Sequence, residues 1–236
     1  MSKENEILLE EKWRKFLGYR WLFYFVPFLD FVLVAGSLVF GKVHENSDFD
    51  VIVGAKSGRI FTARFFCYLI FGAARARRSK LDHKETARDK ICFSHFVTSA
   101  SYGLRPPYNV YWEKLYRCLA PVYGNLHSVE LFFAKNRNWC GREEILLDRN
   151  VWRETKFNFF RHSAEFILGG SFGDFIERFL KKIQISRIRE TLKNYGSGFA
   201  PRLRFGDDEL EFHPDTARIE IMIKEISTGE PLTWEQ

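Results

Sequence analysis

The pattern of apolar and polar positions along the chain predicts both strands and helices in its first half. Residues 31–35 and 49–53 are short apolar runs closed by glycine, a pattern typical of buried strands. Residues 90–97 are rich in apolar residues and predict a third strand. Residues 5–26 and 59–73 carry apolar side chains at helical spacing. The first half of the chain therefore predicts a small mixed sheet with flanking helices.

The second half of the chain is predicted to be more helical. Residues 128–136 form one expected helix, and a stronger one begins at Ser171, whose hydroxyl can cap a helix with Asp174 three residues on. An apolar stripe at helical spacing follows, and we interpret it as part of the core. Two short strand-like segments around a polar turn predict a β-hairpin over 203–212. The stripe consists of Phe172, Phe175, Ile176, Phe179, Leu180 and Ile183.

The composition is that of a folded protein, with 46% hydrophobic and 28% charged residues. A net charge of +6 suits an anionic partner such as a nucleotide or RNA, and it fits an ordinary solvated surface equally well. The basic run over 75–80 is better explained by the favourable placement of cations at a helix C-terminus than by a contact with nucleic acid. The four cysteines match no common zinc pattern, and the charged N-terminal stretch has no signal-peptide pattern. We therefore expect free thiols and a cytoplasmic location.

Residues 21–40 are mostly apolar, which raises the question of whether they form a membrane-spanning helix. Pro27 and Asp30 interrupt the segment, and Gly36 and Ser37 lie near its end. A spanning helix needs about 20 apolar residues and tolerates a central acid poorly. A buried helix followed by a buried strand explains the segment better, so no membrane partner is expected.

Segment 34–53 carries the residues with chemical meaning. Gly36 and Ser37 end the first predicted strand, where a glycine permits a tight turn and lets a phosphate approach the backbone. Ten residues separate this pair from Asp48, and Asp50 lies two positions further on, so both carboxylates face the same side of a strand. Mg²⁺ binds one or two carboxylates together with substrate phosphates. A phosphate-binding turn beside a carboxylate pair therefore indicates metal-assisted transfer of a nucleotide.

This stretch resembles the DNA polymerase beta-like nucleotidyltransferase superfamily, in which Gly-Ser is followed, after a spacer like this one, by Asp-x-Asp within a strand. The layout is most similar to that of the minimal bacterial nucleotidyltransferases, whose members include small-molecule modifiers and toxin-neutralising adenylyltransferases. The resemblance covers residues 29–97, less than a third of the chain. It implies a nucleoside triphosphate as substrate and a divalent metal ion as cofactor.

The resemblance also implies roles for individual residues. Asp48 and Asp50 would bind Mg²⁺ or Mn²⁺ and act as the catalytic acids, while Gly36 and Ser37 would bind the phosphates of the nucleotide, expected to be ATP. Lys42 lies between the two parts, where a lysine can neutralise phosphate charge or belong to the ordinary surface.

Active members of this family usually carry a third carboxylate on the next strand of the core, as a metal ligand and base. Ser94 and His95 occupy the segment where this acid is expected, and Asp89 precedes it. The alternatives are that Asp89 serves, that His95 substitutes, that an acid comes from elsewhere, or that the site binds nucleotide with little turnover. A single histidine on a strand is more often structural, so His95 is not assigned to the site.

A P-loop is a weaker interpretation of the same segment. Gly36-x-x-x-x-Gly41-Lys42 is followed by Val43, in place of the serine or threonine that binds Mg²⁺ in a P-loop. A long helix is also expected after a P-loop, and the chain turns polar too soon for one.

The sequence therefore predicts an α+β protein in two parts. Residues 1–105 form a nucleotidyltransferase core with an N-terminal helix, and residues 106–236 form a mostly helical region with the hairpin, suited to binding an acceptor. The expected reaction moves an NMP from an NTP to a hydroxyl of a protein, small molecule or RNA, with release of pyrophosphate. The alternative, from a different class, is a nucleotide-binding sensor or partner-binding module with a degenerate site.

Overall fold

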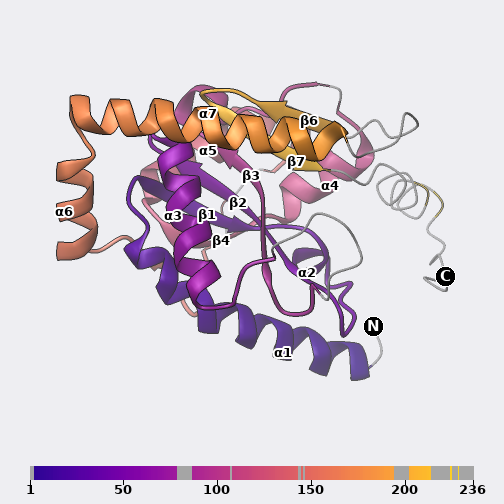
Figure 1. The fold of residues 1–236 in the computed structure, drawn as a ribbon. Coiled ribbons are helices and arrows are strands. Elements are labelled where there is room, and N and C mark those ends of the chain that lie inside the picture. Colours follow the sequence, from indigo (N-terminus) through magenta and orange to yellow (C-terminus); the bar gives the residue numbers. More distant parts are fainter. Residues whose placement is uncertain are drawn as a thin grey trace.

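A seven-stranded mixed sheet forms the centre of the computed structural model, with its strands in the order β5-β4-β1-β2-β3-β7-β6 (Figure 1). The structure describes residues 3–78, 87–106, 108–142, 145, 147–193, 202–213, 224 and 228. The strands are β1 (Leu29–Val34), β2 (Phe49–Ala55), β3 (Ile91–Val97), β4 (Ala120–Gly124), β5 (Arg153–Glu154), β6 (Arg202–Phe205) and β7 (Glu209–His213).

Pairing directions show how the sheet is built from both halves of the chain. β1 pairs antiparallel with β2, and β2 pairs parallel with β3. β4 and β7 extend this unit on its two sides, antiparallel to β1 and β3, and β5 pairs parallel with β4. β6 pairs antiparallel with β7, so the predicted hairpin continues the same sheet. The predicted α+β class is confirmed, and the sheet is larger than the first half of the chain alone predicts.

Helices cover both faces of this sheet. The helix predicted over 5–26 is an α-helix followed by a 3₁₀ turn, and the helix predicted over 128–136 extends further at both ends. The helical segments are α1 (Lys3–Tyr19), η1 (Arg20–Phe25), α2 (Ser37–Phe40), α3 (Ile60–Ala73), η2 (Ser99–Ser101), α4 (Val110–Cys118), α5 (Leu126–Cys140), α6 (Phe159–Ile167) and α7 (Ser171–Lys193).

Alternate residues of the central strands build two separate cores, one on each face of the sheet. Val32 and Val53 belong to the core formed with α1, η1 and α3. Leu33 and Ile52 belong to the core formed with α4 and α5. Because side chains alternate along a strand, Asp50 lies on the α4–α5 face, between two residues of the first core.

Helix α7 crosses the outer side of α3 (Figure 1), and the predicted core stripe is confirmed only in part: its aliphatic members are half-buried, with Leu180 packed against the first core, whereas its phenylalanines are exposed. Phe172, Phe175 and Phe179 are between 53% and 59% exposed. The reason is that α7 turns polar side chains inward. The carboxylate of Glu177 accepts hydrogen bonds from two backbone N–H groups at the start of α3.

The apolar segment 21–40 folds into the interior of the protein. Leu22 and Phe23 of η1 are buried, and so are most residues of β1. Among the residues that the structure describes, no helix is long and apolar enough to span a membrane.

Candidate functional site

Gly36 lies at the end of β1 with its backbone against the carboxylate of Asp50. Its φ and ψ are 67° and −148°, in a region that residues with a side chain rarely adopt. A β-carbon added at Gly36 would lie 2.2 Å from Oδ2 of Asp50. The backbone N–H of Ala35 donates to the carbonyl of Asp50, with 2.9 Å between N and O. Glycine is therefore required here, because the turn brings the end of β1 onto the acid of β2.

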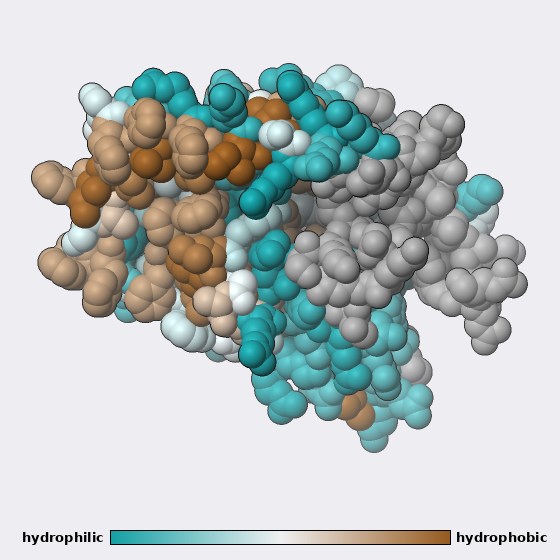
Figure 2. All heavy atoms as spheres, in the orientation of Figure 1, coloured by the Kyte–Doolittle hydropathy of each residue, from teal (hydrophilic) through white to brown (hydrophobic). Residues whose placement is uncertain are grey.

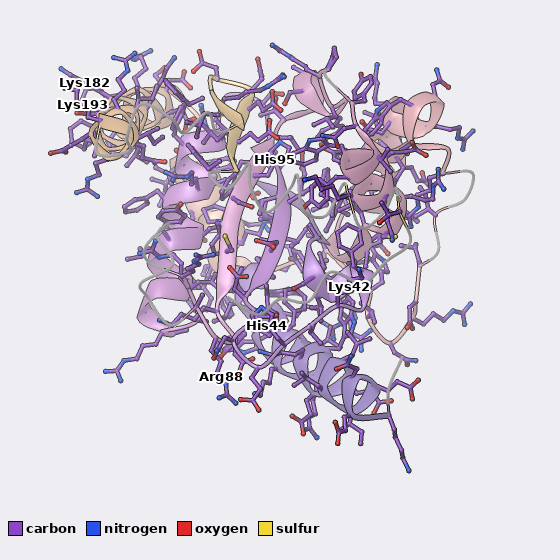
Figure 3. The ribbon with its side chains drawn as sticks, turned by 90° about the vertical axis from the view of Figure 1, so that its right-hand side faces the viewer. Lys42, His44, Arg88, His95, Lys182 and Lys193 are labelled. Carbon is purple, nitrogen blue, oxygen red and sulfur yellow. The ribbon has the colours of Figure 1, made fainter. Side chains whose placement is uncertain are left out.

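Ser37 begins the short helix α2, and Lys42 follows this helix. Gly41 closes it in a left-handed conformation with a φ of 68°. The backbone N–H of Lys42 donates to the carbonyl of Ser37, with 3.0 Å between N and O. The exposed side chain of Lys42 lies with that of His44 at the end of the sheet nearest α1 (Figure 3).

Asp48 and Asp50 lie side by side at the start of β2. Ligand atoms of Asp48, Asp50 and Cys92 all lie within 4.8 Å of one another. Cys92 joins the two acids because β3 pairs parallel with β2 and places Cys92 opposite Asp50. Asp48 is buried and Asp50 is half-buried. The structure thus brings together the two acids that the sequence singles out, and it adds a thiol that sequence reasoning did not select.

The guanidinium of Arg78 lies 2.6 Å from Oδ2 of Asp48. The backbone N–H of Arg78 donates to the carbonyl of Ile91 at the start of β3, which fixes the chain beside the acids. Burial is the largest single effect and would lower the pKa of Arg78, but the charge and hydrogen bond of Asp48, together with the other acidic groups nearby, outweigh it and raise this pKa. Arg78 therefore supplies a positive charge next to Asp48. The basic run over 75–80 is the only sequence signal of this contact, and it does not point to a partner.

Cys92 is a buried thiol rather than a thiolate. Burial, followed by the negative charges of Asp50 and Asp48, raises the pKa of Cys92 well above its ordinary value. Mg²⁺ prefers oxygen ligands, and a protonated thiol is a poor ligand for it. The donor set therefore fits a divalent cation through its two carboxylates, with the remaining positions left to phosphate and water.

Asp89, one of the alternatives for a third acid, contacts the N-terminal helix. Its carboxylate lies 2.8 Å from Nζ of Lys12 and 2.7 Å from Nζ of Lys15, both on α1. Lys12 is buried and also donates to the backbone carbonyls of Glu45 and Ser47. These contacts tie α1 to the loop before β2, so Asp89 has a structural role in holding that loop.

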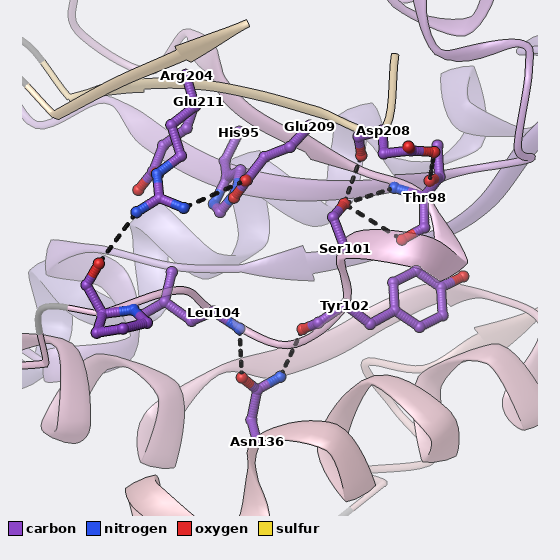
Figure 4. A network of polar contacts seen from close by, with 11 residues as sticks. His95, Thr98, Ser101, Tyr102, Leu104, Asn136, Arg204, Asp208, Glu209 and Glu211 are labelled. Atoms are coloured by element: carbon purple, nitrogen blue, oxygen red, sulfur yellow. Dashed lines mark hydrogen bonds and ion pairs between the residues drawn. The ribbon is translucent and has the colours of Figure 1, made fainter. Parts of the chain in front are cut away.

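His95, the other alternative, lies in a second buried cluster on the α4–α5 face. The ring of His95 and the carboxylates of Glu209 and Glu211 on β7 lie within 4.8 Å of one another, because His95 and Glu211 pair across the two strands. The guanidinium of Arg204 on β6 lies 3.7 Å from Glu209 and 3.6 Å from Glu211 (Figure 4). Because this guanidinium supplies a counter-charge, the cluster forms an ion-pair network that joins the hairpin to the central sheet.

The residues selected from the sequence thus occupy one end of β1 and β2. Gly36 touches Asp50, Asp48 lies beside Asp50, and Ser37 continues the turn, whereas Lys42 lies exposed at the far end of α2. Comparison with protein-family models, curated proteins and solved structures found no match to this chain. The interpretation of the site therefore rests on its own residues and geometry.

Proposed function

We propose that the chain is a metal-dependent nucleotidyltransferase, which moves an NMP from an NTP to a hydroxyl acceptor and releases pyrophosphate. The observation that carries the proposal is the contact between the backbone of Gly36 and the carboxylate of Asp50, with Asp48 alongside. A glycine turn next to paired carboxylates supports the binding of a polyphosphate and a divalent cation at one place. The resemblance of the Gly-Ser and Asp-x-Asp spacing to the nucleotidyltransferase superfamily supports the same function.

Each residue of the site has a distinct role in this proposal. Asp48 and Asp50 hold Mg²⁺ or Mn²⁺, which supplies charge neutralisation of the triphosphate when it is bound. The backbone at Gly36 and the hydroxyl of Ser37 bind the phosphates of the nucleotide, with ATP as the expected substrate. Lys42 adds positive charge at the edge of the site.

The transfer forms a bond between the hydroxyl oxygen of the acceptor and the α-phosphorus. The bond from the α-phosphorus to the bridging oxygen breaks, and pyrophosphate leaves with its electron pair. The proton of the hydroxyl passes to water, since the Cys92 thiol, with its raised pKa, cannot accept it. Without a base in direct contact with the hydroxyl, we expect the transfer to be slow.

Two observations favour a second candidate function, a nucleotide-binding sensor or partner-binding module with a degenerate site. Arg78 neutralises Asp48 in this structure, and Cys92 provides a thiol where a third oxygen ligand would favour catalysis. Both features weaken turnover more than binding, because binding needs only phosphate contacts and one cation.

Incubation with each α-³²P-labelled NTP, Mg²⁺ or Mn²⁺, and host lysate separates the two candidates. The transferase predicts label in a protein, RNA or small-molecule acceptor, together with released pyrophosphate. Asp48→Ala should abolish both products, and Asp89→Asn, which changes an acid outside the group, should retain them. Metal-dependent binding of NTP without label in any acceptor would support the sensor and overturn the transferase.

We also propose a cytoplasmic location, where nucleoside triphosphates and Mg²⁺ are available. The four cysteines are all free thiols, which agrees with a reducing compartment. Fractionation of host cells tests this, and recovery of the protein in the secreted fraction would contradict it.

A further inference from the structure

Helix α6 carries its apolar residues on the side away from the protein. Phe160 and Phe166 are 72% and 88% exposed, and Phe159 and Ile167 are exposed as well. The charged residues at the centre of the helix face the sheet instead. The amphipathic pattern of α6 is therefore inverted relative to that of an ordinary surface helix, which buries its apolar face.

Specific polar contacts fix α6 in this orientation. The guanidinium of Arg161 donates to the backbone carbonyl of Leu29 at 2.7 Å and to the carboxylate of Glu165 at 2.8 Å. Glu165 accepts the backbone N–H of Phe28 at 2.7 Å, and Asn158 caps the helix by accepting the N–H of Arg161. Turning the phenylalanines inward would break these bonds and leave buried charges unpaired, which is strongly unfavourable.

Helix α7 repeats this arrangement after α6. Glu177 and Gln184 face α3, where Glu177 accepts the backbone N–H groups of Phe61 and Thr62 at 2.9 and 2.8 Å. The side-chain amide of Gln184 donates to the carbonyl of Phe61 at 2.8 Å. The exposed phenylalanine stripe of α7 lies on the opposite side of the helix.

Together, α6 and the first half of α7 present one exposed apolar surface, which we name the aromatic face. Figure 2 shows hydrophobic side chains gathered over α6, the first half of α7 and the neighbouring part of α3. Contiguous apolar patches of this kind are rare on monomers in water and mark contact sites for other molecules. The aromatic face consists of Phe157, Phe159, Phe160, Phe166, Ile167, Phe172, Phe175 and Phe179.

The exposed side of α7 changes from aromatic to basic in its second half. At the spacing that keeps residues on one side of a helix, Phe179 is followed by Lys182, Ser186, Arg189 and Lys193, with one acid, Glu190, beside them, all of them exposed. The side chains of Lys182 and Lys193 point away from the rest of the protein (Figure 3). Lys182, Arg189 and Lys193 thus form a basic stripe that continues the aromatic face.

We propose that the aromatic face and the basic stripe bind the surface of an anionic membrane. The phenylalanines enter the boundary between lipid headgroups and acyl chains, as amphipathic helices with separate aromatic and basic sides do. The basic stripe meets the lipid phosphates, whose negative surface potential attracts lysine and arginine. A second copy of the chain would cover the phenylalanines, but the same patch brings three basic residues against the single acid Glu190, so two copies would repel each other more than an anionic surface would.

This contact is peripheral and needs no spanning helix. The expectation of no membrane partner concerns residues 21–40, which are mostly buried in the protein, and does not concern α6 or α7. The proposal is independent of nucleotide transfer, because the group of Asp48, Asp50 and Cys92 contributes nothing to it.

Sedimentation of the full chain with vesicles tests the proposal. Vesicles of phosphatidylcholine with phosphatidylglycerol should bind the protein at least about tenfold more tightly than phosphatidylcholine alone, and added NaCl should release it. Phe160→Ser combined with Phe166→Ser should lower the partition coefficient at least about tenfold. The reason is that the variant lacks the favourable free energy of moving two phenylalanine side chains from water into the membrane. Lys182→Glu combined with Lys193→Glu should have a similar effect on anionic vesicles only.

Two controls on α1, Ile7→Ser and Arg14→Glu, change exposed residues outside the aromatic face and should bind like the wild type. All substituted residues are exposed, so the thermal unfolding of each variant should match that of the wild type. Unchanged binding by the double phenylalanine variant would overturn the proposal. The proposal would also be overturned if the wild type did not bind vesicles and light scattering showed it to be a dimer that the double phenylalanine variant converts to a monomer. That result would assign the aromatic face to a second copy of the chain.

Discussion

The guanidinium of Arg78 and the carboxylate of Asp48 form an ion pair of 2.6 Å inside the group that would hold a metal ion. Both side chains are largely buried, so solvent and salt screen the pair much less than a surface pair. In the proposed function, Asp48 would have two alternative counter-charges, the arginine of the same chain and a divalent cation. Competition between them would set how tightly the site binds metal.

Arg78→Gln should lower the stability of the metal-free protein and increase the stabilisation that Mn²⁺ provides. Loss of the guanidinium leaves the buried carboxylate of Asp48 without that counter-charge, and we expect the free energy of unfolding to fall by about 1–3 kcal/mol. Mn²⁺ then replaces the lost charge, so it should raise the melting temperature more than in the wild type. Differential scanning fluorimetry measures both effects, and a response to Mn²⁺ no larger than that of the wild type would contradict the competition.

Gly36→Ala should disturb the site more than an ordinary glycine substitution. The new β-carbon meets Oδ2 of Asp50 and strains a backbone with a φ of 67°, for an expected loss of about 2–4 kcal/mol in the free energy of unfolding. Gly58→Ala is the matched control, because Gly58 has a φ of 74° and open space around it. Gly58→Ala therefore measures the cost of backbone strain alone, which we expect to lower the free energy of unfolding by about 1 kcal/mol. Urea denaturation measures both variants, and equal losses would show that the contact with Asp50 is unimportant.

Cys92→Asp should increase the rate of nucleotide transfer if the lack of a third oxygen ligand limits that rate. Cys92 pairs with Asp50 across the two strands, so a carboxylate here adds an oxygen ligand beside the two acids. We expect the transfer rate with Mn²⁺ to rise at least about tenfold, as one added metal or base contact commonly contributes. The neutral variant Cys92→Asn has a similar shape and should give no increase. An unchanged rate in the aspartate variant would show that something else limits turnover.

Asp89→Asn should reduce stability in a manner that depends on pH. Burial is the largest single effect and raises the pKa of Asp89, but the hydrogen bonds and positive charges of Lys12 and Lys15 together outweigh burial and lower the pKa below its ordinary value. A lowered pKa in the folded state stabilises the protein above the unfolded pKa of about 4, and this contribution is lost as the pH falls through the folded value. The difference in unfolding free energy between wild type and variant should therefore be largest near pH 7 and shrink below about pH 4. Urea denaturation at several pH values measures this difference, and one that does not change with pH would contradict the assignment of Asp89 to these lysines.

The central strands could be predicted because their signal is local. The runs 31–35, 49–53 and 90–97 are buried on both faces of the sheet, so they are almost continuously apolar in the sequence. The pairing of the hairpin with β3 depends on residues far apart in the chain, which no local pattern reveals. The position of the hairpin within the same sheet therefore emerges only from the structure.

The parts of the site that the sequence does not reveal also depend on contacts between segments that are far apart in the chain. Arg78 reaches Asp48 because the chain after α3 returns to run beside the start of β3. Cys92 lies opposite Asp50 through the register of two strands that are separated in the sequence by α3 and the residues after it. The exposure of the phenylalanines in the stripe on α7 escapes the sequence for a related reason. Apolar periodicity defines one side of a helix, but the inward contact of Glu177 decides which way that side points.

Metal-dependent binding of nucleotide at the two acids is the central claim, because the transferase and the nucleotide sensor both require it. Titration of a fluorescent ATP analogue into the wild type, Asp50→Asn and Asp89→Asn, with and without Mn²⁺, tests it most directly. We predict that the wild type and Asp89→Asn bind the analogue only with Mn²⁺, and that Asp50→Asn binds at least about tenfold more weakly. Equal binding by the wild type and Asp50→Asn, or binding that does not depend on Mn²⁺, would contradict the account.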